Sequence, residues 1–315
     1  MSPGMPLEAV HLVLTYRCTY ECDHCFLHCG PHQPGAMTWA ELEGLLEQAA
    51  AIDGIECIYF EGGEPMLYFP LVQMGIERAE ELGLRSGLVT CGYFATTVPD
   101  GEMWLRPLKA AGLGTVEVSM DRLHGGDEAN ACARNLAEAG HLLGLDVSVI
   151  SVCDPREAAP GEAPASRTGE DPSPAMLRGR AAHQLVEGLP VQHVSAFTEC
   201  PSEDLEAPRR VHVDPYGNVH VCQGILAGNV WDSSLAQVVG GYEPREHPVI
   251  GPLVEGGPKA LAERTGIGTG SHFASECHAC YEIRRALRED PEYRGIMGPN
   301  QVYGEEPEPP PTSYR

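Results

Sequence analysis

Three cysteines lie close together near the start of the chain, in the order Cys18-Thr-Tyr-Glu-Cys22-Asp-His-Cys25. Three thiolates at this spacing can bind three irons of a [4Fe–4S] cluster and leave the fourth iron open. They can also contribute to a zinc site, because Cys29 follows and offers a fourth thiolate. No signal peptide is visible, so the twelve cysteines of the chain favour metal or redox chemistry over disulfides.

A second group of candidate functional residues follows the second predicted strand. The strand at residues 57–60 leads into Glu61 and then Gly62-Gly63-Glu64-Pro65. Two glycines can expose backbone carbonyls, and the acid can present a carboxylate, to a bound ammonium group. Ligands of α/β sheets bind at the carboxyl ends of the strands, which is where this segment is expected.

The elements that position these residues are short apolar runs alternating with helical periodicity. A capping box, Thr38-Trp-Ala-Glu41, marks the first helix. The alternation predicts βαβ units around a parallel sheet, either open or closed into part of a barrel. The predicted strands cover residues 10–14, 57–60, 86–90, 115–119, 146–152 and 191–197.

The cysteine triplet after strand one, combined with the glycine segment after strand two, resembles the radical S-adenosylmethionine (SAM) superfamily. The resemblance implies an α/β fold, a partial (β/α)6 barrel over residues 1–197. It also implies a SAM-cleaving cluster on Cys18, Cys22 and Cys25, whose open iron chelates the amino and carboxylate groups of SAM. Further cofactor-binding residues implied by position are Gly62, Gly63, Glu64, Pro65, Ser119, Asp121, Arg180 and His24, the last where relatives usually carry an aromatic residue.

Four more cysteines lie beyond the predicted barrel: Cys200, Cys222, Cys277 and Cys280. Their pattern resembles the twitch domain, a shortened SPASM extension, and implies a second, auxiliary [4Fe–4S] cluster within an α+β domain at residues 198–290. A zinc ribbon is the alternative that the spacing permits. We expect residues 154–174 to form a mobile loop, and residues 291–315 to form a tail that is extended or disordered at its end.

The remaining cysteines and histidines are less informative. Cys91 follows the third strand, where it is either a hydrogen-atom donor to substrate or a buried, inert thiol. The sequence assigns no role to Cys29, His28 or His32.

The resemblance implies that reductive cleavage of SAM gives a 5′-deoxyadenosyl radical, which abstracts a hydrogen atom from substrate. The auxiliary cluster would then accept an electron, so that a small molecule or a peptide is oxidised or cross-linked. A reductant such as flavodoxin or ferredoxin would supply the first electron. One alternative is a redox-neutral epimerase or isomerase that uses Cys91, and another is a non-enzymatic iron–sulfur carrier or scaffold.

Composition excludes some partners. The chain has 45 acidic and 21 basic residues and a net charge of −24, which repels nucleic acid and anionic lipid surfaces. No run approaches the roughly 18 apolar residues of a membrane span. We therefore expect a cytoplasmic protein that binds neither nucleic acid nor membranes.

Overall fold

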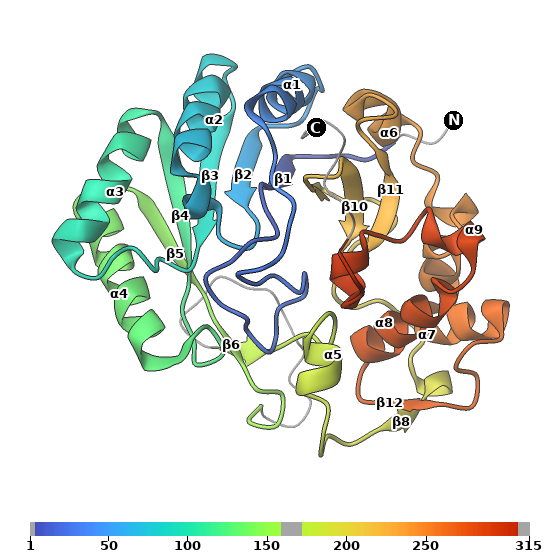
Figure 1. Ribbon diagram of the computed structural model, residues 1–315. Coiled ribbons are helices and arrows are strands. Elements are labelled where there is room, and N and C mark those ends of the chain that lie inside the picture. Colours follow the sequence, from blue (N-terminus) through green and yellow to red (C-terminus); the bar gives the residue numbers. More distant parts are fainter. Residues whose placement is uncertain (1–3, 159–171, 308–315) are drawn as a thin grey trace.

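The computed structural model describes residues 4–158 and 172–307. Its centre is an eight-stranded sheet in the order β11-β10-β9-β1-β2-β3-β4-β5 (Figure 1). The six strands from β9 to β5 are parallel, and β10 and β11 extend the sheet as antiparallel neighbours. The strands are β1 (Ala9–Val13), β2 (Cys57–Glu61), β3 (Arg85–Thr90), β4 (Leu113–Ser119), β5 (Asp146–Ile150), β9 (Arg210–Val213), β10 (Asn218–Cys222) and β11 (Ile225–Asn229).

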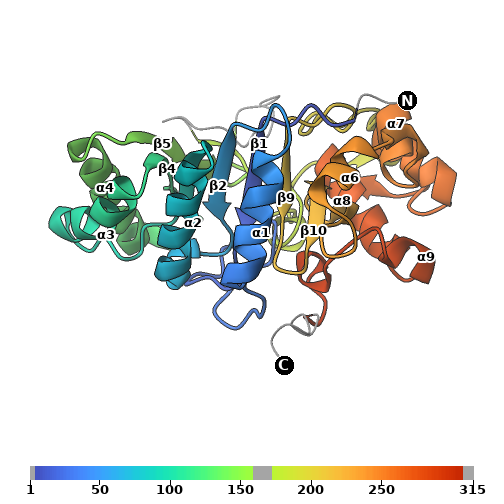
Figure 2. The same ribbon diagram turned by 90° about the horizontal axis from the view of Figure 1, so that it is seen from above.

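Four helices cover the outer face of strands β1 to β5, as the two ribbon views show (Figures 1 and 2). They are α1 (Trp39–Ala50), α2 (Phe69–Glu81), α3 (Val98–Ala110) and α4 (Gly126–Leu142). The predicted capping box is present at Thr38, and apolar residues on one face of α1, such as Leu42 and Leu46, are buried. The predicted α/β class with a parallel sheet is therefore confirmed.

The sixth predicted strand is wrong. Residues 191–197 form β8 (Gln192–His193), which pairs with β12 (His272–Phe273), and a 3-10 turn at Val194–Ala196. Their side chains give no continuous apolar face, since Val191 is 54% exposed. Strand β9, in which Val211 and Val213 are fully buried, takes the place beside β1 instead. One sheet thus runs across the boundary predicted at residue 197, and the division into domains stays a prediction.

The C-terminal part adds helices beside the β10–β11 hairpin (Figure 1). They are α6 (Leu235–Gly240), α7 (Ile250–Thr265), α8 (Glu276–Leu287) and α9 (Pro291–Arg294). Shorter elements are β6 (Val152–Cys153), β7 (Ser173–Pro174), α5 (Ala181–Gln184) and the 3-10 turns Pro65–Tyr68, Pro244–Glu246 and Asn300–Tyr303.

Parts of two segments that the sequence predicts to be flexible fall outside the described residues. Of the loop expected at residues 154–174, only 154–158 and 172–174 are described, and the tail is described as far as residue 307. The described part of the tail begins with α9 and a 3-10 turn, and most of its end, for which extended or disordered chain is predicted, lies outside the described residues. Across the described ranges, no helix has the length and apolar character needed to cross a membrane.

Candidate active site

A cavity of about 770 Å³ lies on the inner face of the sheet, and we call it the central cavity. Cys18, Cys22 and Cys25 line it where the chain leaves β1. We call residues 18–25 the N-terminal cysteine loop. The lining continues down β1, β2 and β9 toward the amino ends of these strands. The cavity therefore joins a triplet of thiols to a polar interior surface of the sheet.

Gly62 and Gly63 hold the chain that leads into the N-terminal cysteine loop. The Gly63 amide donates to the carbonyl of Thr15 at 2.7 Å. A Cβ atom at Gly63 would stand 2.2 Å from the carbonyl oxygen of Arg17, and one at Gly62 would stand 2.5 Å from that of Thr15. Gly62 also has a φ of +151°. Both positions thus require glycine, and both line the cavity.

Glu64 does not present its carboxylate to the cavity, contrary to the sequence-based expectation. The side chain is fully buried and accepts hydrogen bonds from the Met66 amide at 3.0 Å and the Thr90 hydroxyl at 2.7 Å. It also accepts from the amide and the thiol of Cys91, each at 2.9 Å. Burial raises the pKa of Glu64. The carboxylate therefore joins the ends of β2 and β3, and Pro65, also buried, begins the 3-10 turn that follows.

Arg180 was expected to bind SAM, but its guanidinium is already bonded to the protein. It donates to the carbonyl of Cys22 at 2.6 Å and to that of Cys29 at 2.8 Å. The backbone amide of Arg180 donates to the carbonyl of Cys25 at 2.9 Å. These bonds place Arg180 against the backbone of the cysteine loop, whereas Arg178, two residues earlier, lines the cavity.

Ser119 and His24 line the cavity, whereas Asp121 is bonded to His124, which lines it. The Asp121 carboxylate lies 2.8 Å from Nδ1 of His124, and Nε2 of His124 lies 3.1 Å from Nε2 of His24. Burial opposes ionisation of Asp121, but the bond from His124 is the main effect that lowers its pKa. For His24, by contrast, burial is the main effect that lowers the pKa, to about 3. Asp121 therefore orients His124, a residue that sequence reasoning missed.

Cys91 lines the cavity beside the buried Glu64. Burial and the adjacent carboxylate raise the pKa of the Cys91 thiol well above its usual range, so the sulfur keeps its proton. That thiol is oriented by its bond to Glu64, and Thr19 lies 3.7 Å away on the other side.

The four cysteines at positions 200, 222, 277 and 280 meet around a second, smaller pocket, and we call them the C-terminal cysteine group. Cys222 ends β10, while Cys277 and Cys280 lie at the start of α8. The sequence spacing therefore identified residues that the fold brings together from three separate segments.

Two buried arginines face this group. Nη1 of Arg178 lies 3.3 Å from Sγ of Cys222 and 3.2 Å from Glu203, and Arg284 is 1% exposed beside Cys280. Among the described residues, the Nε atoms of both arginines are buried without a hydrogen-bond partner. Buried cationic donors aimed at four thiols fit an anionic, thiolate-ligated group.

The spacing of the sulfurs argues against a single zinc ion at either site. Tetrahedral zinc with bonds of about 2.3 Å brings its sulfur ligands about 3.8 Å apart. In the described residues, which include all twelve cysteines, no three cysteine sulfurs lie within 4.8 Å of one another. A cluster of four irons and four sulfides is larger, so both sets of cysteines fit it better.

Comparison with known proteins agrees with this geometry. Residues 12–125 match the sequence model of the Radical SAM superfamily. This part of the chain is a radical SAM domain. The superfamily identifies the chain as an enzyme, and it implies one [4Fe–4S] cluster with SAM.

Curated relatives carry the name PqqA peptide cyclase. The protein from Xanthomonas oryzae pv. oryzae (strain MAFF 311018) is 35% identical over 164 residues, which cover 48% of this chain and 41% of the relative. The protein from Rhodopseudomonas palustris (strain ATCC BAA-98 / CGA009) is 33% identical over 147 residues, 46% of this chain and 36% of the relative. The matched part is thus about two fifths of the relatives' length.

Among solved structures, BtrN in complex with AdoMet and 2-DOIA has a TM-score of 0.50. The match covers 84% of this chain and 88% of BtrN, at 17% sequence identity. At this identity the likeness concerns the fold alone, and it extends well beyond the radical SAM domain.

Proposed function

We propose that the chain is an oxidative radical SAM enzyme with an auxiliary cluster. In this proposal, Cys18, Cys22 and Cys25 hold the SAM-cleaving [4Fe–4S] cluster, and the C-terminal cysteine group holds a second one. The observation that carries it is the position of Arg178, which lines both the central cavity and the pocket of the C-terminal cysteine group. An electron leaving a substrate in the cavity would have only a short distance to travel to the second site.

Each part of the cavity has a task in this proposal. The first cluster and SAM, when bound, supply a carbon radical that removes one hydrogen atom from substrate. Gly62 and Gly63 fix the cysteine loop, and Ser119 with the His24–His124 pair offers polar groups to SAM. A cluster held by the C-terminal cysteine group would supply an acceptor for the second electron, and loss of one proton from the substrate radical to a basic group would complete a two-electron oxidation.

A peptide is the substrate class that we favour over a free small molecule. The support is the name of the curated relatives, PqqA peptide cyclase, at up to 35% identity. A cavity of about 770 Å³ is also within the usual range for ligand sites and can admit SAM with one substrate side chain. We further propose a flavodoxin or ferredoxin as reductant and a cytoplasmic location.

The test is iron and sulfide content per chain after anaerobic reconstitution, measured with SAM cleavage. Wild type should hold about eight irons. The triple variant Cys18→Ala, Cys22→Ala, Cys25→Ala should hold about four and lose SAM cleavage. The quadruple variant of the C-terminal cysteine group should also hold about four, yet still cleave SAM. Wild type with zinc in place of iron would overturn the proposal, and four irons in wild type would remove the auxiliary cluster.

A redox-neutral epimerase is a second candidate, because the protonated thiol of Cys91 lines the cavity. A thiol that returns a hydrogen atom to substrate would bring solvent deuterium to the reacting carbon in D2O, and the thiyl radical left on Cys91 would take up one electron from the reductant and one proton. The oxidative proposal predicts no such incorporation and little effect of Cys91→Ala. Deuterium in the product that disappears in Cys91→Ala would favour the epimerase.

A further inference from the structure

A second group of potential metal ligands lies deeper in the central cavity, on three adjacent strands. His11 belongs to β1, Glu61 to β2 and His212 to β9. His11 is the register partner of His212, and Glu61 is the partner of Val13, two residues along β1 from His11. Residues two apart on a strand share a face, so all three side chains point to the same side of the sheet. All three line the cavity.

The geometry of the three side chains suits one ion. Nδ1 of His11 lies 3.0 Å from Oε2 of Glu61, and Nε2 of His212 lies 3.3 Å from Oε1 of Glu61. One ligand atom from each of the three residues falls within 4.8 Å of the others. Two ligands on a tetrahedral ion with bonds of about 2.0 to 2.1 Å stand about 3.3 Å apart. Each carboxylate oxygen thus faces a different imidazole at nearly that separation.

Protein hydrogen bonds leave this group incompletely paired. Among the described residues, Oε1 of Glu61 and Oε1 of the neighbouring Gln223 are buried without a hydrogen-bond partner. His212 and Gln223 are joined at 3.5 Å, the limit of a hydrogen bond, and both are more than nine-tenths buried. A buried acceptor without a partner is costly, and a cation at this point would satisfy it.

The charges around the group favour a cation. Two arginines lie nearby on β9 and just before it, but Arg209 pairs with Glu8 and Arg210 with Glu203, the latter at 3.4 Å. On β4, Glu117 also lines the cavity, and burial together with the nearby Glu61 carboxylate raises the pKa of Glu117. The positive charge of Arg210 reaches Glu61 and Glu117 but is shared with Glu203, so two carboxylates face one shared guanidinium.

We propose that His11, Glu61 and His212 bind one divalent transition-metal ion at the end of the central cavity away from the cysteine loop. Two imidazoles and a carboxylate are a ligand set of first-row metals, and three protein ligands leave coordination positions open. Those positions face the cavity, where a carbonyl or carboxylate oxygen of the substrate can occupy them. The ion would hold the substrate, whereas the cysteine loop would hold SAM.

The test is titration of the full chain, reconstituted with iron and sulfide, with Mn²⁺ and separately with Co²⁺, followed by electron spin resonance. Oxidised [4Fe–4S] clusters are diamagnetic, so the signal of the added ion can be read directly. We expect one tight site per chain, with nitrogen coupling from imidazole. Glu61→Gln, which keeps the shape of the side chain, and His212→Gln should each weaken binding by at least about 100-fold.

His272→Gln is the matched control, because His272 is exposed on β12, outside the cavity. It should bind the ion as wild type does, and all variants should keep the wild-type iron content. If Glu61→Gln fails to fold, His11→Gln replaces it. Absence of a site for either ion, or unchanged binding in Glu61→Gln and His212→Gln, would overturn the proposal. Since the readout is ion binding, it is independent of SAM cleavage and of the auxiliary cluster.

Discussion

The two sets of cysteines lie in different surroundings. The N-terminal cysteine loop faces a cavity of about 770 Å³, and backbone contacts from Gly62, Gly63 and Arg180 hold it. The C-terminal cysteine group surrounds a small pocket with the buried side chains of Arg178 and Arg284. An open site suits a cluster that must bind SAM, and a closed, cationic site suits one that exchanges electrons. In the proposed function, SAM and substrate would react at the first site, and the second site would exchange electrons.

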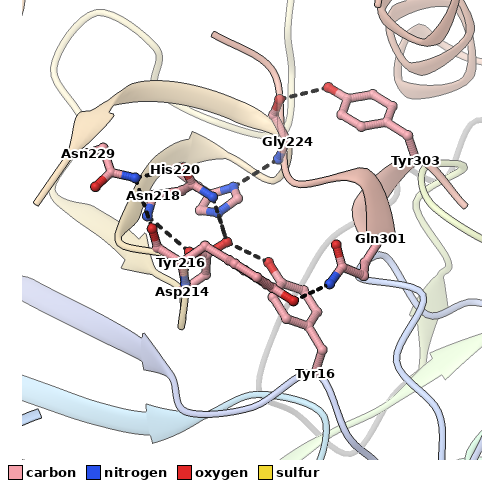
Figure 3. A network of polar contacts seen from close by, with 9 residues as sticks. All are labelled: Tyr16, Asp214, Tyr216, Asn218, His220, Gly224, Asn229, Gln301 and Tyr303. Atoms are coloured by element: carbon pink, nitrogen blue, oxygen red, sulfur yellow. Dashed lines mark hydrogen bonds and ion pairs between the residues drawn. The ribbon is translucent and has the colours of Figure 1, made fainter. Parts of the chain in front are cut away.

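One buried carboxylate connects the two regions (Figure 3). Asp214 accepts from the hydroxyl of Tyr16 at 2.8 Å, and Tyr16 lies two residues before Cys18. It also accepts from the amides of Tyr216 and Asn218, each at 2.9 Å, in the turn that leads to Cys222. His220 lies 3.2 Å from the same carboxylate. The network thus joins the chain that leads to Cys18 with the hairpin that ends at Cys222.

The largest effect is expected from Asp214→Asn, which should destabilise both regions together. With its oxygen kept on the two backbone amides, asparagine would turn its NH2 group, which cannot accept a hydrogen bond, toward the Tyr16 hydroxyl and His220. Leaving buried donors unpaired should cost about 3 kcal/mol in free energy of unfolding. The midpoint of unfolding by guanidinium chloride measures this cost, and both clusters should be lost from part of the reconstituted chains.

Asp232→Asn is the control for this substitution, because Asp232 is exposed just after the same hairpin. It should change the free energy of unfolding by less than about 0.5 kcal/mol. If Asp214→Asn were equally mild, or emptied one cluster alone, the network would not couple the two regions.

Gly179→Ala should affect only the N-terminal cysteine loop, with a smaller effect. Gly179 has a φ of +60°, and a Cβ there would stand 2.5 Å from Cα of Phe26 and 2.7 Å from the carbonyl oxygen of Cys25. Left-handed backbone and overpacking together should cost about 2 kcal/mol. We expect weaker SAM binding and slower SAM cleavage, with the auxiliary cluster retained.

Gly188→Ala separates backbone strain from this clash. Gly188 has a similar φ of +80°, but a Cβ there meets no atom within 4 Å. It should leave SAM binding unchanged. Equal effects at positions 179 and 188 would mean that the contact with the cysteine loop is unimportant.

The sequence predicted the parts of this arrangement that local spacing determines. The capping box at Thr38 marked α1, and the cysteine triplet with Gly62 and Gly63 marked one edge of the sheet. These signals depend on residues close together in the chain. The choice of Arg210–Val213 over residues 191–197 as the sixth parallel strand depends on which run can bury an apolar face against β1. That is decided by the tertiary structure.

The sequence also did not indicate the directions in which the side chains of the site point. The sequence located Glu64 at the end of the second strand, but its carboxylate turns toward Thr90 and Cys91, away from the cavity. Arg180 was expected to bind SAM, yet the structure bonds it to the cysteine loop and leaves Arg178 at the cavity. His11, Glu61 and His212 were missed, because residues that are 50 and more positions apart give no local pattern.

The smallest expected effect tests the charge at the C-terminal cysteine group. Nη1 of Arg178 lies 3.3 Å from the sulfur of Cys222, so its positive charge should stabilise the reduced form of a cluster there. Arg178→Gln should lower the reduction potential of the auxiliary cluster by about 40 mV, which corresponds to about 1 kcal/mol for one electron. A redox titration followed by spin resonance measures this, and the potential of the SAM-cleaving cluster should change less.

Arg178→Lys keeps the charge and should recover most of the potential, which a purely structural role would not predict. Arg264→Gln, at an exposed arginine paired with Glu255, should leave both potentials unchanged. If Arg178→Gln moved both potentials equally, the arginine would act on the two clusters alike. Its place between the two pockets would then matter more than its contact with Cys222, because a charge between the clusters raises both potentials together.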